Sequence, residues 1–279
     1  YKVMGCNMNN QPIGFIDSGV GGLSVIKEVM KVLPNEQLYF IGDTARNPYG
    51  SRPLNEVRNF SRQLANFLQT KKIKLLVIAC NTATAAALDV LQNELDIPVI
   101  GVIEPGSKSA VESTKNNTIG VIGTKGTIHS EEYENKIKQL NQSTLIKSVA
   151  CQPFVKIVEE DNLNSNEITE VVENSLKAFN RVDMDTLILG CTHFPLIESY
   201  IRDYFGEQVT LINPGVETAL LVQQTLIKEN LLNEEESQPK EHIFYTTGLA
   251  EKFEEMAKKW LDNKNFRVEH LPLKELVNK

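Results

Sequence analysis

Two cysteines stand at matching places in the sequence, each directly after an apolar run. Residues 75–79 read LLVIA before Cys80, and residues 186–190 read TLILG before Cys191. Small polar residues follow both, which is typical of the turn from a buried strand into a helix N-terminus. That position lowers the pKa of a thiol and exposes its sulfur. We therefore expect both cysteines to be reactive and to act together.

Inversion at a carbon beside a carboxylate is a reaction that uses two such groups. One group must remove the proton from one face while the other returns a proton to the opposite face. A thiol suits both roles, since its pKa of about 8.5 can be tuned towards neutral pH. A lone buried cysteine more often only packs in a core. Cys151 has no matching partner and is therefore assigned to structure, and Cys6 lies in a suspect N-terminal segment.

Other uses of the two thiols fit the sequence less well. A phosphatase cysteine needs an arginine further along its loop, but Ala86 and Ile197 stand six residues after the two cysteines. Zinc held by Cys80, Cys191 and His193 would lack the closely spaced Cys or His pairs typical of structural zinc sites. A hydrolase nucleophile would leave the second cysteine unexplained. We predict that the chain has no metal site.

A glycine-rich turn, DSGVGG at 17–22, follows the first apolar run. Asp17 and Ser18 have the chemistry to bind an ammonium group, and the glycines allow close backbone approach. A dinucleotide-binding loop would need glycine at position 24, where Ser24 stands. We therefore expect no nucleotide cofactor.

Two further turns have both an ordinary and a functional interpretation. NPYGSRP at 47–53 is either a simple Pro/Gly turn or a clasp for a carboxylate, made by backbone amides and the Tyr49 hydroxyl. GTKGT at 123–127 is either a capped helix start or the counterpart of the first glycine-rich turn. Without further context, Glu159 is a solvated helix charge and His193 an interior histidine.

The composition is that of a globular chain without an export signal. Its 279 residues are 41% hydrophobic and 23% charged, enough for a large core or two domains. No apolar run approaches the roughly 20 residues that cross a bilayer, and widely spread cysteines without a signal peptide favour the cytoplasm. A net charge of −7 does not favour a nucleic-acid partner. Residues 1–7, ahead of Met8, are interpreted as an appended leader.

Short apolar runs alternate with segments of helical periodicity, for example at 23–33 and 168–179. This alternation is typical of βαβ units and a parallel sheet. The predicted strands lie at residues 13–17, 37–43, 75–79, 97–103, 119–123, 144–150, 186–190 and 208–212, with a further strand-like run at 242–247.

The second half of the chain repeats the order of the first. Four landmarks keep nearly one separation along the chain, so we predict two similar α/β units, each with a cysteine after its third strand. Ligands bind beyond the carboxyl ends of parallel strands, so the units are expected to face a central cleft. The corresponding landmarks are Ile16 and Ile122, Leu38 and Leu145, Cys80 and Cys191, and Pro105 and Pro214.

The predicted fold class is therefore α/β, with two pseudo-symmetric domains built on mainly parallel sheets. An acidic linker at 233–241 precedes the C-terminal segment, which is expected to return to the first unit. The predicted domains are 8–103 plus 213–279, which makes the first domain discontinuous, and 104–212.

In combination these segments resemble the cofactor-independent aspartate/glutamate racemase family, and within it the glutamate racemases. The matching segments occur in the family's order and span residues 13 to 248, nearly the whole chain. Any one of them is a weak signal, whereas the ordered set is highly specific. They are IGFIDSGVGGLSV, GDTARNPYGSR, VIACNTATA, IGVIGTKGT, FVKIVE, LILGCTHFPL and FYTTG.

The resemblance implies an isomerase that interconverts L- and D-glutamate without pyridoxal phosphate, metal or nucleotide. Such an enzyme provides D-glutamate for bacterial peptidoglycan, and so for cell-wall biogenesis and cell shape. The resemblance also implies that Cys80 is the base acting on D-glutamate and Cys191 the base acting on L-glutamate. Asp17 would assist Cys80, and Glu159 with His193 would support Cys191.

The same resemblance implies a set of substrate ligands. Tyr49 and Gly50 look like the clamp for the side-chain carboxylate, whereas most of the others look like ligands of the α-amino and α-carboxylate groups. The full set is Asp17, Ser18, Pro48, Tyr49, Gly50, Asn81, Thr82, Thr124, Thr127, Thr192 and His193.

Three other functions fit parts of the sequence. An aspartate racemase, or another amino-acid racemase of the same group, would bind a substrate that differs by as little as one methylene, and pocket depth is not readable from the sequence. A non-catalytic amino-acid binding protein would also use two lobes around a cleft, but it needs no nucleophiles. A pyridoxal-dependent racemase needs a lysine site, and none is recognisable. Family members are often dimers, so a homodimer is expected.

Overall fold

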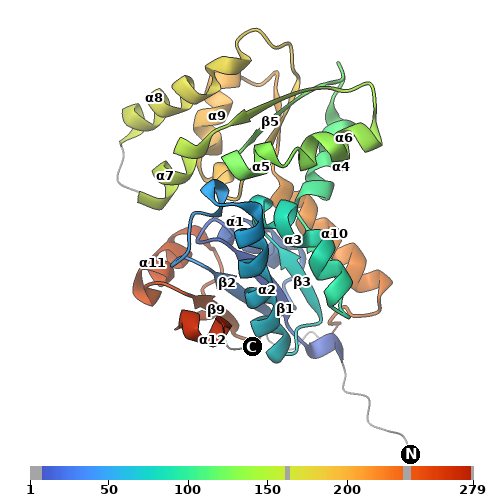
Figure 1. Cartoon of the computed structure of the whole chain (residues 1–279), viewed down its shortest axis with the longest axis vertical. Helices are drawn as coiled ribbons and strands as arrows, with labels where there is room; N and C mark the ends of the chain where they lie inside the picture. Colours follow the sequence, from blue (N-terminus) through green and yellow to red (C-terminus); the bar gives the residue numbers. More distant parts are fainter. Residues whose placement is uncertain (1–7, 161–163, 235–239, 278–279) are drawn as a thin grey trace, which may run out of the picture.

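The computed structural model describes residues 8–160, 164–234 and 240–277 and contains two sheets, one in each half of the molecule (Figure 1). Every strand pair within them is parallel. The expected leader and residues 235–239 of the expected linker lie outside the described residues. The larger sheet contains β1 (Ile13–Asp17), β2 (Leu38–Gly42), β3 (Leu75–Ile78), β4 (Val99–Gly101), β9 (His242–Thr246) and β10 (Phe266–His270). The smaller sheet contains β5 (Thr118–Gly123), β6 (Leu145–Ala150), β7 (Thr186–Gly190) and β8 (Thr210–Ile212).

The strand order confirms the predicted repeat. The larger sheet has the order β10-β9-β2-β1-β3-β4, and the smaller sheet has the order β6-β5-β7-β8. The first four strands of each unit are therefore arranged identically, and β3 corresponds to β7. All nine expected strands are present, whereas β10 was not expected from the sequence.

Helices cover both faces of each sheet. Those packed on the larger sheet are α1 (Leu23–Val32), α2 (Leu54–Thr70), α3 (Asn81–Glu94), α10 (Pro214–Lys228), α11 (Ala250–Trp260) and α12 (Leu273–Val277). The other half contains α4 (Ile103–Ser113), α5 (Lys125–His129), α6 (Glu132–Leu140), α7 (Gln152–Glu160), α8 (Ser165–Leu176) and α9 (Glu198–Phe205). Short 3-10 helices lie at η1 (Met8–Asn10), η2 (Tyr49–Ser51), η3 (Lys177–Phe179) and η4 (Phe194–Ile197). No helix among the described residues has the length and apolar character to span a membrane.

Alternating side chains of the central strands fill two cores. On β1, Phe15 packs with α1, α10 and α11, whereas the next residue, Ile16, packs with α2 and α3. This alternation follows from the two-residue period of a strand, and both faces are apolar because helices cover both. The smaller sheet is built likewise, with α7, α8 and α9 on one face and α4 and α6 on the other.

The edge strand β6 departs from the expectation that the strands are buried on both faces. On β6 no residue is fully buried, and Leu145 is 65% exposed. This strand has a neighbour on one side only, because it forms the edge of its sheet.

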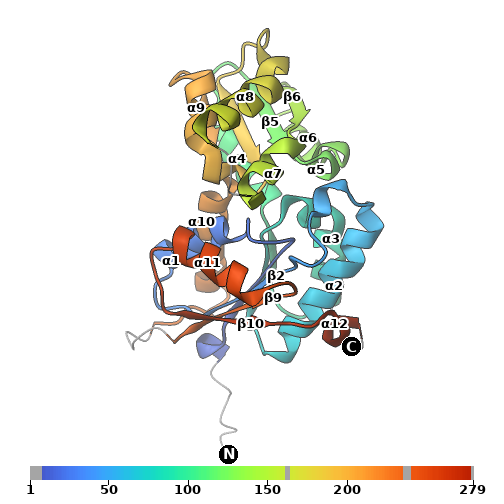
Figure 2. The ribbon, with the colours of Figure 1, turned by 90° about the vertical axis from the view of Figure 1, so that its left-hand side faces the viewer.

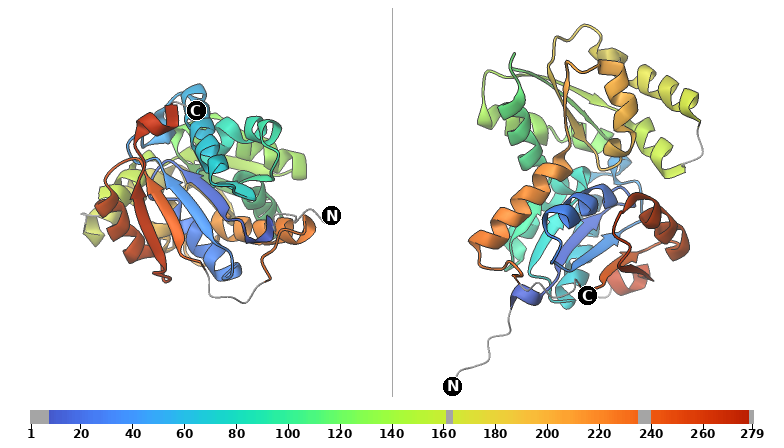
Figure 3. Two further views of the ribbon diagram at one scale, coloured as in Figure 1. Left: turned by 90° about the horizontal axis from the view of Figure 1, so that it is seen from below. Right: turned by 180° about the vertical axis from the view of Figure 1, so that it is seen from behind.

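The C-terminal segment returns to the larger sheet, where β9 pairs with β2 and β10 pairs with β9 (Figure 2). After β8, α10 starts at the junction of the halves and runs along the lower half (Figure 3, right, orange). It packs against α1 through Ala219 and Val222. The precise domain boundaries stay a prediction.

A buried ion pair connects four segments at the amino ends of the strands. Lys74 Nζ lies 2.6 Å from Glu36 Oε2, and the two side chains are 0% and 2% exposed. The ammonium also donates to the carbonyls of Asn9, at 2.6 Å, and Leu231, at 2.8 Å. The other oxygen of Glu36 accepts from the backbone N–H of Asn233 at 2.8 Å. Each charge is thus compensated by several partners, as burial requires.

Replacing Lys74 by Met leaves the Glu36 carboxylate buried without its counter-charge. We expect Lys74→Met to lower the free energy of unfolding by about 3–5 kcal/mol, measured by urea denaturation. The exposed Lys147 on β6 provides the control, because Lys147→Met removes the same charge at a solvent-exposed position. It should change the free energy of unfolding by under about 0.5 kcal/mol. Equal effects of the two substitutions would contradict this account of the ion pair.

Candidate active site

The predicted site residues meet where the carboxyl ends of the two sheets face one another. The cavity between them is narrow, with about 10 Å³ of free space, roughly enough for one water molecule. Its walls come from turns after strands of both sheets, so neither unit forms the site alone. The lining residues are Ser18, Asn47, Pro48, Tyr49, Gly50, Cys80, Asn81, Thr82, Thr124, Val155, Cys191, Thr192 and His193.

Three predicted residues stand directly behind this lining. Asp17, Thr127 and Glu159 do not line the cavity, but each is hydrogen-bonded to a residue that does. The structure therefore brings all the predicted site residues together, while their individual roles stay predictions.

Cys80 lies at the N-terminus of α3, as the sequence predicts. Its sulfur accepts a hydrogen bond from the backbone N–H of Ala83 at 3.4 Å, and the residue is 6% exposed. Burial, and next the nearby charges of Asp17 and Cys191, raise the pKa of Cys80 to about 12. The expectation of a lowered pKa at this thiol is therefore wrong, because desolvation of the thiolate outweighs the favourable helix N-terminus.

Cys191 does not begin an α-helix, so the expectation for its local structure is also wrong. A turn follows it, then η4, and α9 starts only at Glu198. The Cys191 N–H donates back to the carbonyl of Leu189 at 2.9 Å, and Pro195 occupies the first turn of η4. Its sulfur instead lies 3.6 Å from Nδ1 of His193.

His193 connects Cys191 to a half-buried carboxylate. Its Nε2 lies 2.7 Å from Oε1 of Glu159, on α7. Burial opposes a charge on this imidazole, but hydrogen bonds to Cys191 and Glu159 outweigh burial and raise the pKa of His193 well above its usual value. For Glu159, burial is likewise outweighed, by His193 and by the Asn47 amide, so the pKa of its carboxyl is lowered. A protonated His193 therefore lies beside the Cys191 sulfur.

Asp17 connects the two units beneath the cavity. Its Oδ1 accepts from the N–H of Gly19 at 2.9 Å, and its Oδ2 accepts from the hydroxyl of Thr192 at 3.2 Å. The carboxyl is 1% exposed, and burial raises its pKa to about 6, against the opposing charge of His193. Asp17 thus changes its protonation state close to neutral pH, which suits a group that exchanges protons.

Three threonine hydroxyls form a cluster across the junction of the units. Thr82, on α3, lies 2.9 Å from the Thr124 hydroxyl and 3.1 Å from that of Thr127, and the last two are 3.1 Å apart. Beside them, Oδ1 of Asn81 accepts from the hydroxyl of Tyr133 at 2.6 Å. These contacts orient polar groups of both units towards one cavity.

The Tyr49 hydroxyl uses its proton in a hydrogen bond within the protein, so it cannot donate to a substrate carboxylate. It donates to Oδ2 of Asp43, which also accepts from Nε of Arg46 at 2.7 Å. The second oxygen of Asp43 accepts from the hydroxyl of Thr247 at 2.8 Å. The predicted clamp must therefore come from the main chain of Tyr49 and Gly50 rather than from the phenol. This network also fixes the loop that contains the cis Asn47-Pro48 peptide bond.

The glycine-rich turn after β1 permits close contact between the units. A Cβ atom on Gly21 would lie 2.5 Å from the Thr192 hydroxyl oxygen and 2.6 Å from His193 Nδ1. Any larger residue would push the Cys191 turn away from Asp17.

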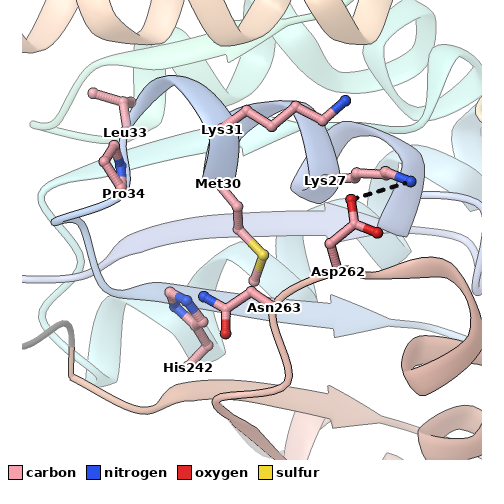
Figure 4. Close-up of a pocket in the computed structure, with 8 residues that line it drawn as sticks. All are labelled: Lys27, Met30, Lys31, Leu33, Pro34, His242, Asp262 and Asn263. Carbon is pink, nitrogen blue, oxygen red and sulfur yellow. Dashed lines mark ion pairs between the residues drawn. The ribbon is translucent and has the colours of Figure 1, made fainter.

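A second cavity, of about 270 Å³, lies between α1 and the segment after α11 (Figure 4). It includes His242 at the start of β9 and an ion pair between Lys27 and Asp262, whose atoms are 3.5 Å apart. This cavity is at the amino ends of the parallel strands, whereas ligands of such sheets bind at the carboxyl ends. The cavity with the two cysteines is therefore the candidate site.

Comparison with known proteins assigns the family. Residues 13–222 match the family Asp/Glu/Hydantoin racemase. The chain belongs to this family. This racemase is 52% identical over 266 residues to the glutamate racemase of Pediococcus pentosaceus, across 95% of this chain and 100% of that protein.

Solved structures of relatives share the fold of this racemase. It matches the glutamate racemase of Bacillus anthracis with a TM-score of 0.91 and 42% identity, over 95% of this chain and 98% of that one. It matches the glutamate racemase of Francisella tularensis, solved in complex with D-glutamate, with a TM-score of 0.88 and 35% identity, over 95% and 98% of the two chains. The predicted resemblance and the α/β fold class are thereby confirmed.

Sequence reasoning missed four residues of this site in the racemase. Asn47 and Val155 line the cavity, and Asp43 and Tyr133 hold lining residues through hydrogen bonds. Asp43 gave a usable signal, because it follows a strand of a parallel sheet at the edge where ligands bind. Tyr133 gave none, since it reaches the site from a helix that the repeat does not connect to either cysteine.

Glu159 is expected to hold the proton on His193. In Glu159→Gln the negative charge is lost, so the imidazolium is less stabilised and the pKa of His193 should fall. An NMR titration of isotope-labelled histidines measures this pKa directly. Glu160→Gln is the matched control, because Glu160 is the next residue on α7, is exposed, and pairs with Lys156. An unchanged titration of His193 in Glu159→Gln would show that the carboxylate does not act on it.

Proposed function

We propose that this racemase interconverts L-glutamate and D-glutamate by cofactor-independent two-base proton transfer at the α-carbon. One observation carries the proposal: Cys80 and Cys191 line one cavity from corresponding strand ends of two similar sheets. Two thiols approaching from different units suit attack on opposite faces of one carbon. The identities of its relatives support glutamate as the substrate.

The reaction from L-glutamate starts with Cys191 as the thiolate. Its sulfur takes the α-proton, so an S–H bond forms as the Cα–H bond breaks, and the electron pair stays on the α-carbon beside the carboxylate. Cys80 then gives its own proton to the opposite face, so its S–H bond breaks and a new Cα–H bond forms. The turnover ends with Cys191 as thiol and Cys80 as thiolate, and D-glutamate reacts by the reverse steps.

The surroundings of the two cysteines support these starting states. The raised pKa of Cys80 keeps its proton in place, while protonated His193 faces the Cys191 sulfur. The proposed mechanism requires that the two sulfur atoms hold one proton between them. Asp17, with its pKa of about 6, is suited to assist Cys80 in recovering its proton between turnovers.

The remaining polar groups are proposed to hold the substrate. Ser18, Asn81 and the threonines of the site would bind the α-amino and α-carboxylate groups, and the main chain of Tyr49 and Gly50 would bind the side-chain carboxylate. Removing the α-proton is difficult because the carbanion that it leaves is unstable, so fixing both carboxylates near the thiols lowers the barrier by orientation. His193 and Pro48 complete the wall.

The proposal extends to the biological role. The product, D-glutamate, would be supplied in the cytoplasm for peptidoglycan, and the enzyme would act as a homodimer. Gel filtration with light scattering measures the dimer, and complementation of a D-glutamate auxotroph tests the role.

The proposed activity is tested in D₂O with L-glutamate, a chelator and no added cofactor. Optical activity should be lost while deuterium enters the α-position of D-glutamate, because the returned proton comes from a solvent-exchanged thiol. Circular dichroism and mass spectrometry follow the two changes together. L-aspartate in the same assay tests the rival substrate. No change with either amino acid would overturn the proposal in favour of a binding protein.

Each cysteine should be indispensable in both directions. A serine hydroxyl is a far weaker acid than a thiol, so Cys80→Ser and Cys191→Ser should each lower kcat/KM by roughly 10³-fold or more for both enantiomers. Cys151→Ala is the control, because Cys151 is buried in the core of the smaller unit and lines no part of the cavity. Near-normal turnover in either serine variant would refute the two-base mechanism.

A further inference from the structure

Tyr133 is a buried phenol that the mechanism above does not use. It lies in the first turn of α6, in the upper half of the molecule, and is 3% exposed. In Figures 1 and 2, α6 lies in the half that faces α3 across the junction of the two units. The side chain therefore comes from one unit and reaches towards the other.

The hydroxyl of Tyr133 crosses that junction to the residue after Cys80. It donates to Oδ1 of Asn81 at 2.6 Å. Because the carbonyl oxygen of the amide can only accept, the phenol is the donor, and the bond fixes which way the amide faces. Asn81 is 4% exposed and lines the cavity, so its orientation decides which polar group it presents to a substrate.

The ring of Tyr133 meets the chain beside the other cysteine. A Cβ atom on Gly190 would lie 3.0 Å from Cε2 of Tyr133 and 2.6 Å from the carbonyl oxygen of Ile122. The ring thus packs on the main chain of Gly190, the last residue of β7, immediately before Cys191. Burial, and next the nearby charge of Cys191, raise the pKa of Tyr133, so the phenol stays protonated and able to donate.

We propose that Tyr133 is a positioning residue for the racemisation, fixing Asn81 beside Cys80 while it packs against the turn that carries Cys191. The inference rests on the proposed function, since it assigns Tyr133 a part in that reaction. A single rigid side chain touches the segments next to both cysteines, so it sets the placement of one relative to the other. Proton transfer to opposite faces of one carbon is sensitive to this placement, because small displacements of reacting groups cost large factors in rate.

The test is Tyr133→Phe, which keeps the ring against Gly190 and removes only the hydroxyl. We expect kcat/KM to fall roughly 10- to 100-fold, with a higher KM and a lower kcat, because the Asn81 amide loses its orienting bond. The fall must be equal for both enantiomers, since L- and D-glutamate have equal free energy. Circular dichroism measures both directions, and thermal unfolding confirms that the variant is folded.

Tyr204→Phe is the matched control. The Tyr204 hydroxyl also donates to an asparagine oxygen, that of Asn180, but on α9 and away from the cavity. This variant should keep its kcat and KM. If Tyr133 had only a structural role, Tyr133→Phe would lower the folded fraction of the protein, and so the apparent kcat, without raising KM.

A double-mutant cycle with Asn81→Ala decides the route of the effect. If Tyr133 acts through Asn81, Tyr133→Phe should have little further effect in the Asn81→Ala background. Additive losses, or wild-type kinetics in Tyr133→Phe, would overturn the inference. If Tyr133→Phe proves unfolded, Asn81→Asp is compared with Asn81→Ala instead, because only the carboxylate keeps an oxygen that accepts from the phenol. Asn81→Asp must then be the more active of the two variants. An inactive unmodified protein would instead overturn the proposed function, and with it this inference.

Discussion

The proposed mechanism requires two sulfur atoms to face one carbon from opposite sides, and the arrangement of the two sheets meets this requirement. Residues that follow neighbouring strands of one parallel sheet lie along one edge, so a single sheet offers its side chains from one side only. Two sheets with facing carboxyl edges remove this limit. The same local design, a cysteine after the third strand, then serves twice, at Cys80 and Cys191. The additional strands β9 and β10 extend the larger sheet at its far edge, where Thr247, just after β9, holds Asp43 and thereby the loop that closes the cavity.

The two cysteines follow corresponding strands but differ in their chemical surroundings. The Cys80 sulfur accepts a hydrogen bond from a backbone N–H and lies near the carboxyl of Asp17. Cys191 instead lies beside the pair of His193 and Glu159. Identical surroundings would give two thiols the same tendency to lose a proton, and the mechanism needs one thiol and one thiolate. The difference does not favour either product, because the enantiomers have equal free energy. In the proposed mechanism the two sulfur atoms exchange protonation states in each turnover, so protons must be returned between turnovers in the same direction.

Much of this could be predicted from the sequence, and the exceptions have physical causes. The central strands are buried on both faces, so they stand out as apolar runs, and the repeated order of landmarks located both cysteines. In contrast, β10 has the sequence FRVEH and lies at a sheet edge, where charged side chains conceal the strand. The α-helix expected at Cys191 does not form. The Cys191 N–H instead donates back to the Leu189 carbonyl in a tight turn, and Pro195 lies in the 3-10 helix η4 that follows. The partner of the Tyr49 hydroxyl, Asp43, depends on packing in three dimensions, which spacing along the chain does not encode.

The small volume of the cavity bears both on how a substrate enters and on how water is excluded. Space for about one water molecule is far too little for glutamate, so the halves or their side chains must move apart to admit it. Across the cavity they are joined by polar contacts, including the threonine cluster, the bond from Thr192 to Asp17, and the bond from Ser24 to the Thr192 carbonyl at 2.9 Å. Each such bond is worth only about 1 kcal/mol, because water replaces it when it opens. Closure then returns the thiols, His193 and Asp17 to a dry site, where their charges interact more strongly than in water. Weak polar contacts between the units therefore make possible both the opening that binding needs and the dry surroundings that proton transfer needs.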